Sequence, residues 1–282
     1  MENLRKYKIA VVQMDSRNDK GANLRAACAR IDEAAAAGAK LVSFPEVMNL
    51  SGENIGEGGG HEPIPGYTTE KLMAKAREHG IYIHSGSFAE EIPGETRAYN
   101  TSVIIDPNGE IIATYRKLHT FDVTLPDGSV QDESARIRPG DEIVTVDTAL
   151  GKMGMSICYD IRFGEMYRLM ALEGAQVIFT PASFTMATGK DHWEPILRTR
   201  AIENGCYIVA ADQFGQKARF PAFGNSMVID PWGTIIARGG ERADLIYAEI
   251  DLDYLDAVRA RIPSLKNRRS DVYDVVRKDK KP

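Results

Sequence analysis

Residues 103–113 read VIIDPNGEIIA, and residues 227–237 read MVIDPWGTIIA, 124 positions further along the chain. Each copy is a pair of apolar runs joined by Asp-Pro-x-Gly, in which proline and glycine favour the backbone angles of a tight turn. Both stretches therefore predict a β-hairpin. Because this turn is common, two such hairpins could resemble each other by chance, and the segments before them decide between repeat and coincidence.

Those segments contain the same order of predicted elements in both halves. Short runs rich in Val and Ile predict buried strands, and the helices between them end near glycines. The first half has a strand at 9–14, a helix at 23–37, a strand at 40–45, a helix at 68–78, a strand at 81–88 and hairpin strands at 102–105 and 111–116. The second half has a strand at 153–159, a helix at 165–173, a strand at 176–180, a helix at 193–204 and a strand at 206–211 before its hairpin.

This repeat predicts the architecture. A sheet covered by helices on one face must bury its other face, and two such sheets can pack on each other. We therefore expect an α/β fold, a four-layer α-β-β-α sandwich with pseudo-two-fold symmetry. It is one domain over residues 1–282, with halves at about 8–118 and 151–240. The rival is a (β/α)-barrel, which would not explain the paired hairpins.

Composition excludes several classes of protein. The chain has 282 residues, of which 43% are hydrophobic and 27% charged, and its net charge of −5 argues against a general nucleic-acid binder. Residues 256–282 hold nine Lys or Arg against four Asp, a local charge of +5, so the rest of the chain carries −10. We interpret this basic tail as a solvated end, or as an arm that packs on the partner in a homodimer or higher homo-oligomer.

The sequence predicts a cytoplasmic protein with no membrane segment. No run approaches the roughly 18 apolar residues of a membrane helix, and no signal-peptide core follows the first residues. The three cysteines are too few and too scattered for a disulfide framework. The five histidines show no metal-ligand spacing, so we expect no metal and no cofactor.

Three chemically distinct side chains follow predicted strands, where α/β active sites usually form. Glu46 follows the strand at 40–45, Lys117 follows the strand at 111–116, and Cys158 lies near the end of the strand at 153–159. A cysteine nucleophile needs a base or a nearby cation, and an oxyanion needs donors such as an ammonium or the backbone N–H of Tyr159. From the residues alone, Cys158 could also be an inert buried thiol, Glu46 a loop carboxylate and Lys117 a surface lysine. We expect the other two cysteines, Cys28 and Cys206, to be inert core thiols.

Three short motifs carry a family resemblance. Phe-Pro-Glu at 44–46, Tyr-Arg-Lys-Leu-His at 115–119 and Cys-Tyr-Asp-Ile-Arg-Phe at 158–163 resemble the signature blocks of the carbon–nitrogen hydrolase (nitrilase) superfamily. The resemblance implies a Glu46, Lys117 and Cys158 triad, the same sandwich fold and a dimer. It also implies an additional active-site glutamate, which is Glu133 in Gln-Asp-Glu-Ser at 131–134, with Asp132 as the neighbour that could be confused with it.

Further segments resemble the Nit branch of this superfamily. They lie at 185–194, 198–201, 230–233, 262–264 and 268–273. The branch includes ω-amidase and deaminated-glutathione amidase, so the resemblance implies a small amide that carries a carboxylate and releases ammonia. Arg162 and Thr188 are then the implied carboxylate ligands. Where the branch reads Arg-Phe-Pro-Glu, this chain has Gly164 in place of proline, which removes a fixed φ just before a helix and bears on substrate choice more than on mechanism.

Several alternatives remain open. The substrate could be an N-carbamoyl amino acid or a nitrile, and a Cys-His hydrolase could use His119 or His192 in place of Glu46. A catalytically inactive binding module is the alternative from another class. The glycine-rich residues 56–60 lack the Lys-Ser/Thr of a phosphate-binding loop, so we expect a mobile active-site loop. Trp193 and Trp232 are expected to be packing residues.

Overall fold

The computed structural model describes residues 4–52, 60–124, 128 and 130–278, and these form two main sheets between helices. The glycine-rich segment predicted as a mobile loop falls almost entirely outside the described residues. The first sheet has the order β17-β1-β2-β3-β5-β4, with β6 also paired to β5. Its strands are β1 (Lys6–Gln13), β2 (Leu41–Ser43), β3 (Tyr82–His84), β4 (Phe88–Glu91), β5 (Ala98–Ile105), β6 (Ile111–Arg116) and β17 (Asp244–Asp251).

The second sheet has the order β16-β15-β12-β11-β10-β9. Its strands are β9 (Thr145–Thr148), β10 (Gly151–Met155), β11 (Val177–Phe179), β12 (Tyr207–Ala210), β15 (Met227–Ile229) and β16 (Ile235–Arg238). Two separate hairpins are formed by β7 (Asp122–Thr124) with β8 (Val130–Asp132), and by β13 (Phe214–Gln216) with β14 (Pro221–Phe223). The helices are α1 (Lys20–Ala36), α2 (Tyr67–His79), α3 (Gly164–Leu172), α4 (Met186–Asn204) and α5 (Leu252–Arg261).

The two sheets repeat one pairing pattern. In each, three parallel strands (β1-β2-β3 and β10-β11-β12) are followed by an antiparallel hairpin (β5-β6 and β15-β16). Both hairpins carry an irregularity at the same position, between Ile104 and Ile105 in one and between Val228 and Ile229 in the other. The predicted internal repeat is therefore confirmed, and the barrel alternative is wrong because the strands form two open sheets.

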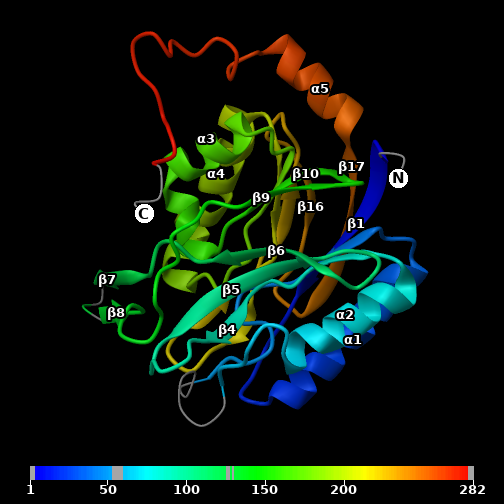
Figure 1. Ribbon diagram of the computed structural model, residues 1–282, viewed down its shortest axis with the longest axis vertical. Coiled ribbons are helices and arrows are strands. Elements are labelled where there is room, and N and C mark those ends of the chain that lie inside the picture. Colours follow the sequence, from blue (N-terminus) through cyan, green and yellow to red (C-terminus); the bar gives the residue numbers. More distant parts are fainter. Residues whose placement is uncertain (1–3, 53–59, 125–127, 129, 279–282) are drawn as a thin grey trace.

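Alternate residues of β1 show how the layers pack. Ile9 and Val11 face the cluster of apolar side chains shared by the two sheets, whereas Ala10 and Val12 face the cluster that includes α1 and α2. A strand buried on both faces needs this continuous apolar sequence. Figure 1 shows α1 and α2 on one side of the strands and α3 and α4 on the other, which is the expected four-layer sandwich.

The last strand joins the two ends of the chain. β17 pairs antiparallel with β1 along its whole length, from Asp244 opposite Gln13 to Asp251 opposite Lys6. The sequence analysis missed this strand and the helix α5 that follows it. Beyond α5 the chain, drawn in red in Figure 1, has turns at 264–267 and 270–272 and then comes back beside α3, where Arg277 Nη2 lies 2.6 Å from Glu173 Oε1.

Two predicted boundaries are corrected. The strand expected at 81–88 is divided into β3 and β4, because the chain bends at Gly86, which has a φ of +67°. The helix expected at 193–204 begins at Met186, because the hydroxyl of Thr185 caps it by accepting a bond from the backbone N–H of Thr188. No helix among the described residues is long and apolar enough to span a membrane.

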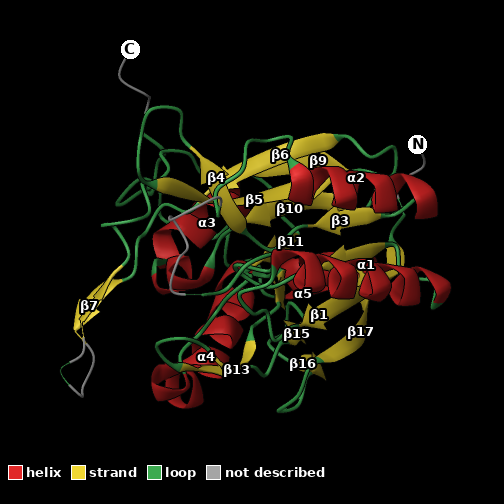
Figure 2. Cartoon of the chain, turned by 90° about the horizontal axis from the view of Figure 1, so that it is seen from below, coloured by secondary structure: helices red, strands yellow, loops and turns green. Residues whose placement is uncertain are grey.

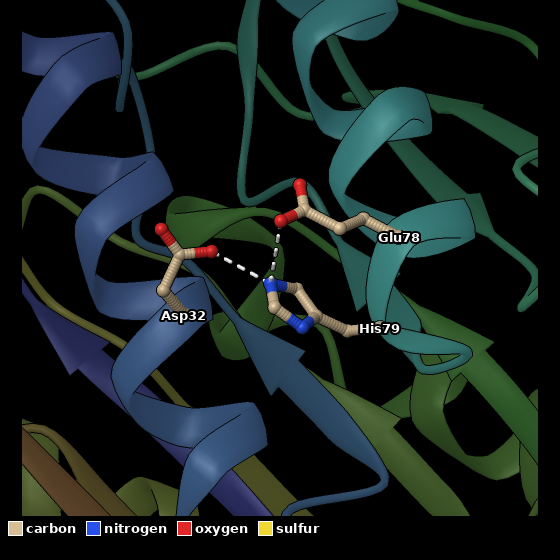
Figure 3. Close-up of side chains that lie close together, drawn as sticks. All are labelled: Asp32, Glu78 and His79. Carbon is tan, nitrogen blue, oxygen red and sulfur yellow. Dashed lines mark hydrogen bonds and ion pairs between the residues drawn. The ribbon is translucent and has the colours of Figure 1, made fainter.

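The only group of possible metal ligands among the described residues lies between α1 and α2, which pack side by side (Figures 2 and 3). Asp32 Oδ1 lies 2.6 Å from His79 Nε2 and 2.7 Å from Lys75 Nζ, which also lies 2.9 Å from Glu78. The Lys75 ammonium lowers the pKa of Asp32. Because a lysine supplies the positive charge, we interpret this group as an ion-pair network that holds the two helices together.

Candidate active site

Most of the predicted site residues lie around one cavity at the ends of the strands. Glu46 follows β2, Lys117 follows β6, and Cys158 opens the 3₁₀ turn η1 (Cys158–Arg162) after β10. The side chains from the prediction that line the cavity are Glu46, Lys117, Glu133, Cys158, Tyr159 and Thr188. The carboxyl ends of the parallel strands thus bring together residues more than 100 positions apart, as the fold predicts.

Lys117 is held between two carboxylates. Its Nζ lies 3.0 Å from Glu46 Oε1 and 2.8 Å from Glu133 Oε2, and its side chain is only 2% exposed. Burial alone disfavours the ammonium and lowers the pKa, but the negative charges of Glu133 and Glu46 outweigh it. The pKa of Lys117 therefore lies well above its usual value. Lys117 is a fixed cation in the cavity wall.

The two carboxylates are themselves fixed by donors from other elements. Glu46 accepts hydrogen bonds from Asn100 Nδ2 and from the backbone N–H of Ser183, both at 2.8 Å. Glu133 accepts one from the backbone N–H of Phe121 at 2.6 Å. These bonds leave each carboxylate little freedom to rotate, so the triad geometry is built in before any ligand arrives.

The neighbouring acids Asp132 and Glu133 occupy different positions relative to the cavity. Asp132 lies outside the described lining of the cavity, and its Oδ1 accepts bonds from Ser134 Oγ and the backbone N–H of Ala135. It therefore caps a turn. Glu133 is the acid that reaches Lys117.

Cys158 sits at a sharp corner of the backbone. Its φ is +48°, a left-handed conformation that is uncommon for a residue with a side chain, and its N–H donates to the carbonyl of Pro181 at 2.8 Å. Burial and the charge of Glu46 raise the pKa of the thiol well above its usual value, although Lys117 acts in the opposite direction. The resting thiol is therefore protonated and needs a base to become a nucleophile.

A buried aspartate that the sequence analysis missed links the turn that begins at Cys158 to the segment around Lys117. Asp160 accepts hydrogen bonds from the hydroxyl of Tyr115 at 2.6 Å, from the backbone N–H of Ile157 at 2.8 Å and from that of His119 at 3.1 Å. The imidazole Nδ1 of His119 lies 2.7 Å from the same carboxylate. Asp160 thus ties residues on both sides of Cys158 and Lys117 to one group.

The two histidines of the alternative mechanism are held by other groups. His119 is engaged by Asp160 and stacks on Phe163 with ring centroids 3.5 Å apart. His192 Nδ1 lies 3.4 Å from the guanidinium of Arg162. Neither imidazole is among the described residues that line the cavity. The position of Glu46 in the cavity favours it as the base.

The predicted carboxylate ligands differ in their placement. Thr188 lines the cavity from the first turn of α4, and its hydroxyl lies 3.0 Å from that of Thr185. Arg162 is not part of the described lining. Its guanidinium lies over the rings of Phe184 and Tyr159, at 5.5 and 5.9 Å from the ring centroids. Both aromatic residues line the cavity, so Arg162 contacts residues of the cavity wall without being part of the described lining.

Gly164 makes room for another arginine. A Cβ at this position would lie 3.0 Å from Arg200 Nη1, and Arg200 Nε donates to the carbonyl of Ile161 at 2.8 Å. Gly164, which replaces the proline of the branch pattern, therefore lies beside the Arg200 guanidinium, which packs against the turn that begins at Cys158.

The chain matches the carbon–nitrogen hydrolase family over residues 8–260, which is most of its length. It belongs to that family. It is similar to the deaminated glutathione amidase of Synechocystis, at 42% identity over 94% of this chain and 99% of the relative. It is also similar to the mouse omega-amidase NIT2, at 38% identity over 98% of this chain and 99% of the relative.

Among solved structures, Saccharomyces cerevisiae Nit3, a member of branch 10 of the nitrilase superfamily, is 34% identical to this hydrolase. The likeness covers 94% of this chain and 97% of Nit3, with a TM-score of 0.85. The Nit-branch resemblance and the sandwich fold are both confirmed. As a member of this family, the chain is an amidase, a hydrolase of carbon–nitrogen bonds other than peptide bonds.

Several lining residues of this carbon–nitrogen hydrolase carried no sequence signal. They are Asn100 in β5, Phe121 and Arg136 in the segments around the β7–β8 hairpin, Ser183 after β11, and Lys217 and Arg219 between β13 and β14. Each comes from a segment with no recognisable motif. Only their position in the fold identifies them.

Proposed function

We propose that this enzyme hydrolyses the C–N bond of a small carboxylate-bearing amide through a thioester on Cys158. Glu46 takes the proton of the thiol, and the sulfur adds to the amide carbonyl carbon. The resulting oxyanion accepts hydrogen bonds from the Lys117 ammonium and the backbone N–H of Tyr159. The observation that carries the proposal is the placement of Glu46, Lys117 and Cys158 on one cavity.

The second half of the reaction reuses the same base. Glu46 gives its proton to the leaving nitrogen, which departs as ammonia from a primary amide or as an amine from a substituted one. Water then loses a proton to Glu46 and attacks the thioester, and the returned proton regenerates the Cys158 thiol as the acid leaves. Glu133 keeps Lys117 charged and oriented throughout, supported by its 2.8 Å contact with the ammonium.

The substrate class rests on the relatives and on the predicted ligands. One relative is named an omega-amidase and another a deaminated glutathione amidase, so an ω-amide of a 2-oxo acid or deaminated glutathione is proposed for this chain. Arg162, Thr188 and Tyr159 are the proposed substrate-binding residues. An N-carbamoyl amino acid or a nitrile is the alternative substrate within the family. A catalytically inactive binding module is disfavoured because the whole triad is present.

We also propose a cytoplasmic homodimer or higher homo-oligomer. The three free thiols fit a reducing compartment. The segment after α5 exposes Val272, Tyr273 and Val276, of which the two valines are each 68% exposed. Exposed apolar side chains on this basic segment fit packing against a second copy of the chain.

An ammonia-release screen tests the function directly. It would compare ω-amides of 2-oxo acids, carbamoyl amino acids and nitriles, with amine release measured for deaminated glutathione. Cys158→Ala is expected to abolish turnover, and Cys28→Ala, a change in α1 far from the triad, is expected to retain it. Turnover that survives Cys158→Ala would contradict the mechanism, and turnover that survives Glu46→Gln but is lost in His119→Gln or His192→Gln would favour a histidine base.

A further inference from the structure

Two arginines that the proposed mechanism does not use face the same cavity. Arg136 lies three residues after Glu133, and Arg219 lies in the turn between β13 and β14. Both line the cavity, and Arg219 is exposed whereas Arg136 is partly buried. Within the part of the chain that the structure describes, neither guanidinium forms an ion pair within 4.0 Å with a carboxylate.

The two positive charges repel each other. Burial and the neighbouring charge of Arg219 lower the pKa of Arg136, although the carboxylates of Glu133 and Asp132 act in the opposite direction. Guanidinium groups stay charged at neutral pH, so this pair gains stability from an anion placed between them. A carboxylate fits, because the planar guanidinium presents two parallel N–H donors to its two oxygens.

The third cation in this region is already satisfied. Lys217 Nζ lies 2.9 Å from Asp15 Oδ1 and donates to Gln213 Oε1 at 3.0 Å and to the carbonyl of Ser16 at 3.2 Å. Its backbone N–H donates to the carbonyl of Phe220 at 2.8 Å, which closes the turn that presents Arg219. Lys217 therefore positions the hairpin and leaves anion binding to the two arginines.

The backbone of Arg136 is fixed in a similar way. Its N–H donates to the carbonyl of Glu133 at 3.0 Å, and its carbonyl accepts from the N–H of Ala98 at 3.0 Å. Glu133, which contacts Lys117, and Arg136, which lines the cavity, thus lie in one short turn. A substrate whose carbonyl carbon lies at Cys158 can direct its other end to the two arginines, because all three residues line the same cavity.

We infer, resting on the proposed amide hydrolysis, that Arg136 and Arg219 form a subsite for an anionic group at the substrate end opposite the scissile bond. The substrate class is then an amide whose acyl or amine part ends in a carboxylate. This subsite is separate from Arg162, which lies over the rings of Phe184 and Tyr159 and is not part of the described cavity lining.

Two amides of equal chain length test the subsite. Glutaramate ends in a carboxylate and pentanamide ends in a methyl group, so the ratio of their kcat/KM values measures recognition of the charge. Arg136→Gln and Arg219→Gln are each expected to lower this ratio about tenfold, mainly through the KM for glutaramate, as loss of a charge-assisted hydrogen bond would. Arg138→Gln is the matched control, because Arg138 is exposed and paired with Glu95. Its ratio should not change.

Calorimetric titration of glutarate into Cys158→Ala protein separates this inference from the proposed function. The affinity for glutarate should be lower in the double variant Cys158→Ala with Arg136→Gln than in Cys158→Ala alone, and it should fall as the salt concentration is raised. If neither amide is hydrolysed yet glutarate binding depends on the arginines, the proposed function fails and the subsite stands. If both amides are hydrolysed and only Arg162→Gln lowers the ratio, or no arginine variant does, the subsite is refuted.

Discussion

Replacing Asp160 by alanine should destabilise the protein and disable its nucleophile together. The carboxylate is fully buried and accepts bonds from Tyr115, Ile157 and His119. Removal leaves at least two buried donors unpaired, at about 1–3 kcal/mol each, or about 2–6 kcal/mol in total. We therefore expect Asp160→Ala to lower the free energy of unfolding by about 3–5 kcal/mol. Asp160→Asn, which keeps one acceptor oxygen, should lower it by about half as much.

Urea unfolding measures the stability change, and steady-state kinetics on any amide that the enzyme hydrolyses measures the loss of function. Because the Ile157 bond to Asp160 spans Cys158, kcat should fall at least about tenfold in Asp160→Asn. Asp147→Asn is the control, since that side chain is 85% exposed and lies 3.6 Å from Lys152. Its effect should stay below about 0.5 kcal/mol. The reasoning is refuted if Asp160→Ala unfolds at the same urea concentration as Asp147→Asn.

Two further predictions concern the first sheet. His84 is buried between hydroxyls and its pKa is lowered to about 3 by burial, so the unfolded chain binds the proton first and stability falls as pH drops from about 6.5 towards 3. His84 contributes up to about 1.4 kcal/mol per pH unit to the slope of the unfolding free energy against pH. Urea unfolding at several pH values should show a shallower slope in His84→Gln than in the unchanged protein, and equal slopes would contradict the prediction. Gly86→Ala should cost about 2–4 kcal/mol, because its φ is +67° and a Cβ would lie 2.0 Å from the carbonyl oxygen of Pro45. Gly94→Ala has a similar φ of +80° with nothing within 4 Å, so it should cost only about 1 kcal/mol, and equal losses in the two variants would refute the steric cause.

The repeat was predictable because its signal is local. The D-P-x-G hairpins and the apolar runs before them carry their own structure, and the structure repeats even the irregularity beside Ile105 and Ile229. The pairing of β17 with β1 was not predictable in this way. Lys6 and Asp251 are opposite each other, yet they lie at the two ends of the chain, and no short-range pattern specifies a partner so distant.

The site residues also differ in whether short-range sequence patterns could predict them. Glu46 and Lys117 follow predicted strands, Cys158 was expected near the end of a strand at 153–159 that ends at Met155, and all three lie in short motifs, so both the fold and the resemblance pointed to them. Asn100 lies near the start of β5, before the strand expected at 102–105, and its bond to Glu46 exists only because the start of β5 lies beside the carboxyl end of β2 in the folded sheet. Arg219 lies in a hairpin turn that carries no motif, and only the folded chain places it beside the cavity.

Detection of a covalent acyl group on Cys158 tests the central claim most directly. The enzyme would be mixed with a hydrolysed amide, quenched in acid within its first turnovers and examined by intact mass and peptide mapping. The mechanism predicts a mass increase equal to the acyl group of the substrate less the thiol hydrogen, located on the peptide that contains Cys158 and absent in Cys158→Ala. Full turnover with no adduct at any quench time, or an adduct on Cys28 or Cys206, would contradict the proposed mechanism.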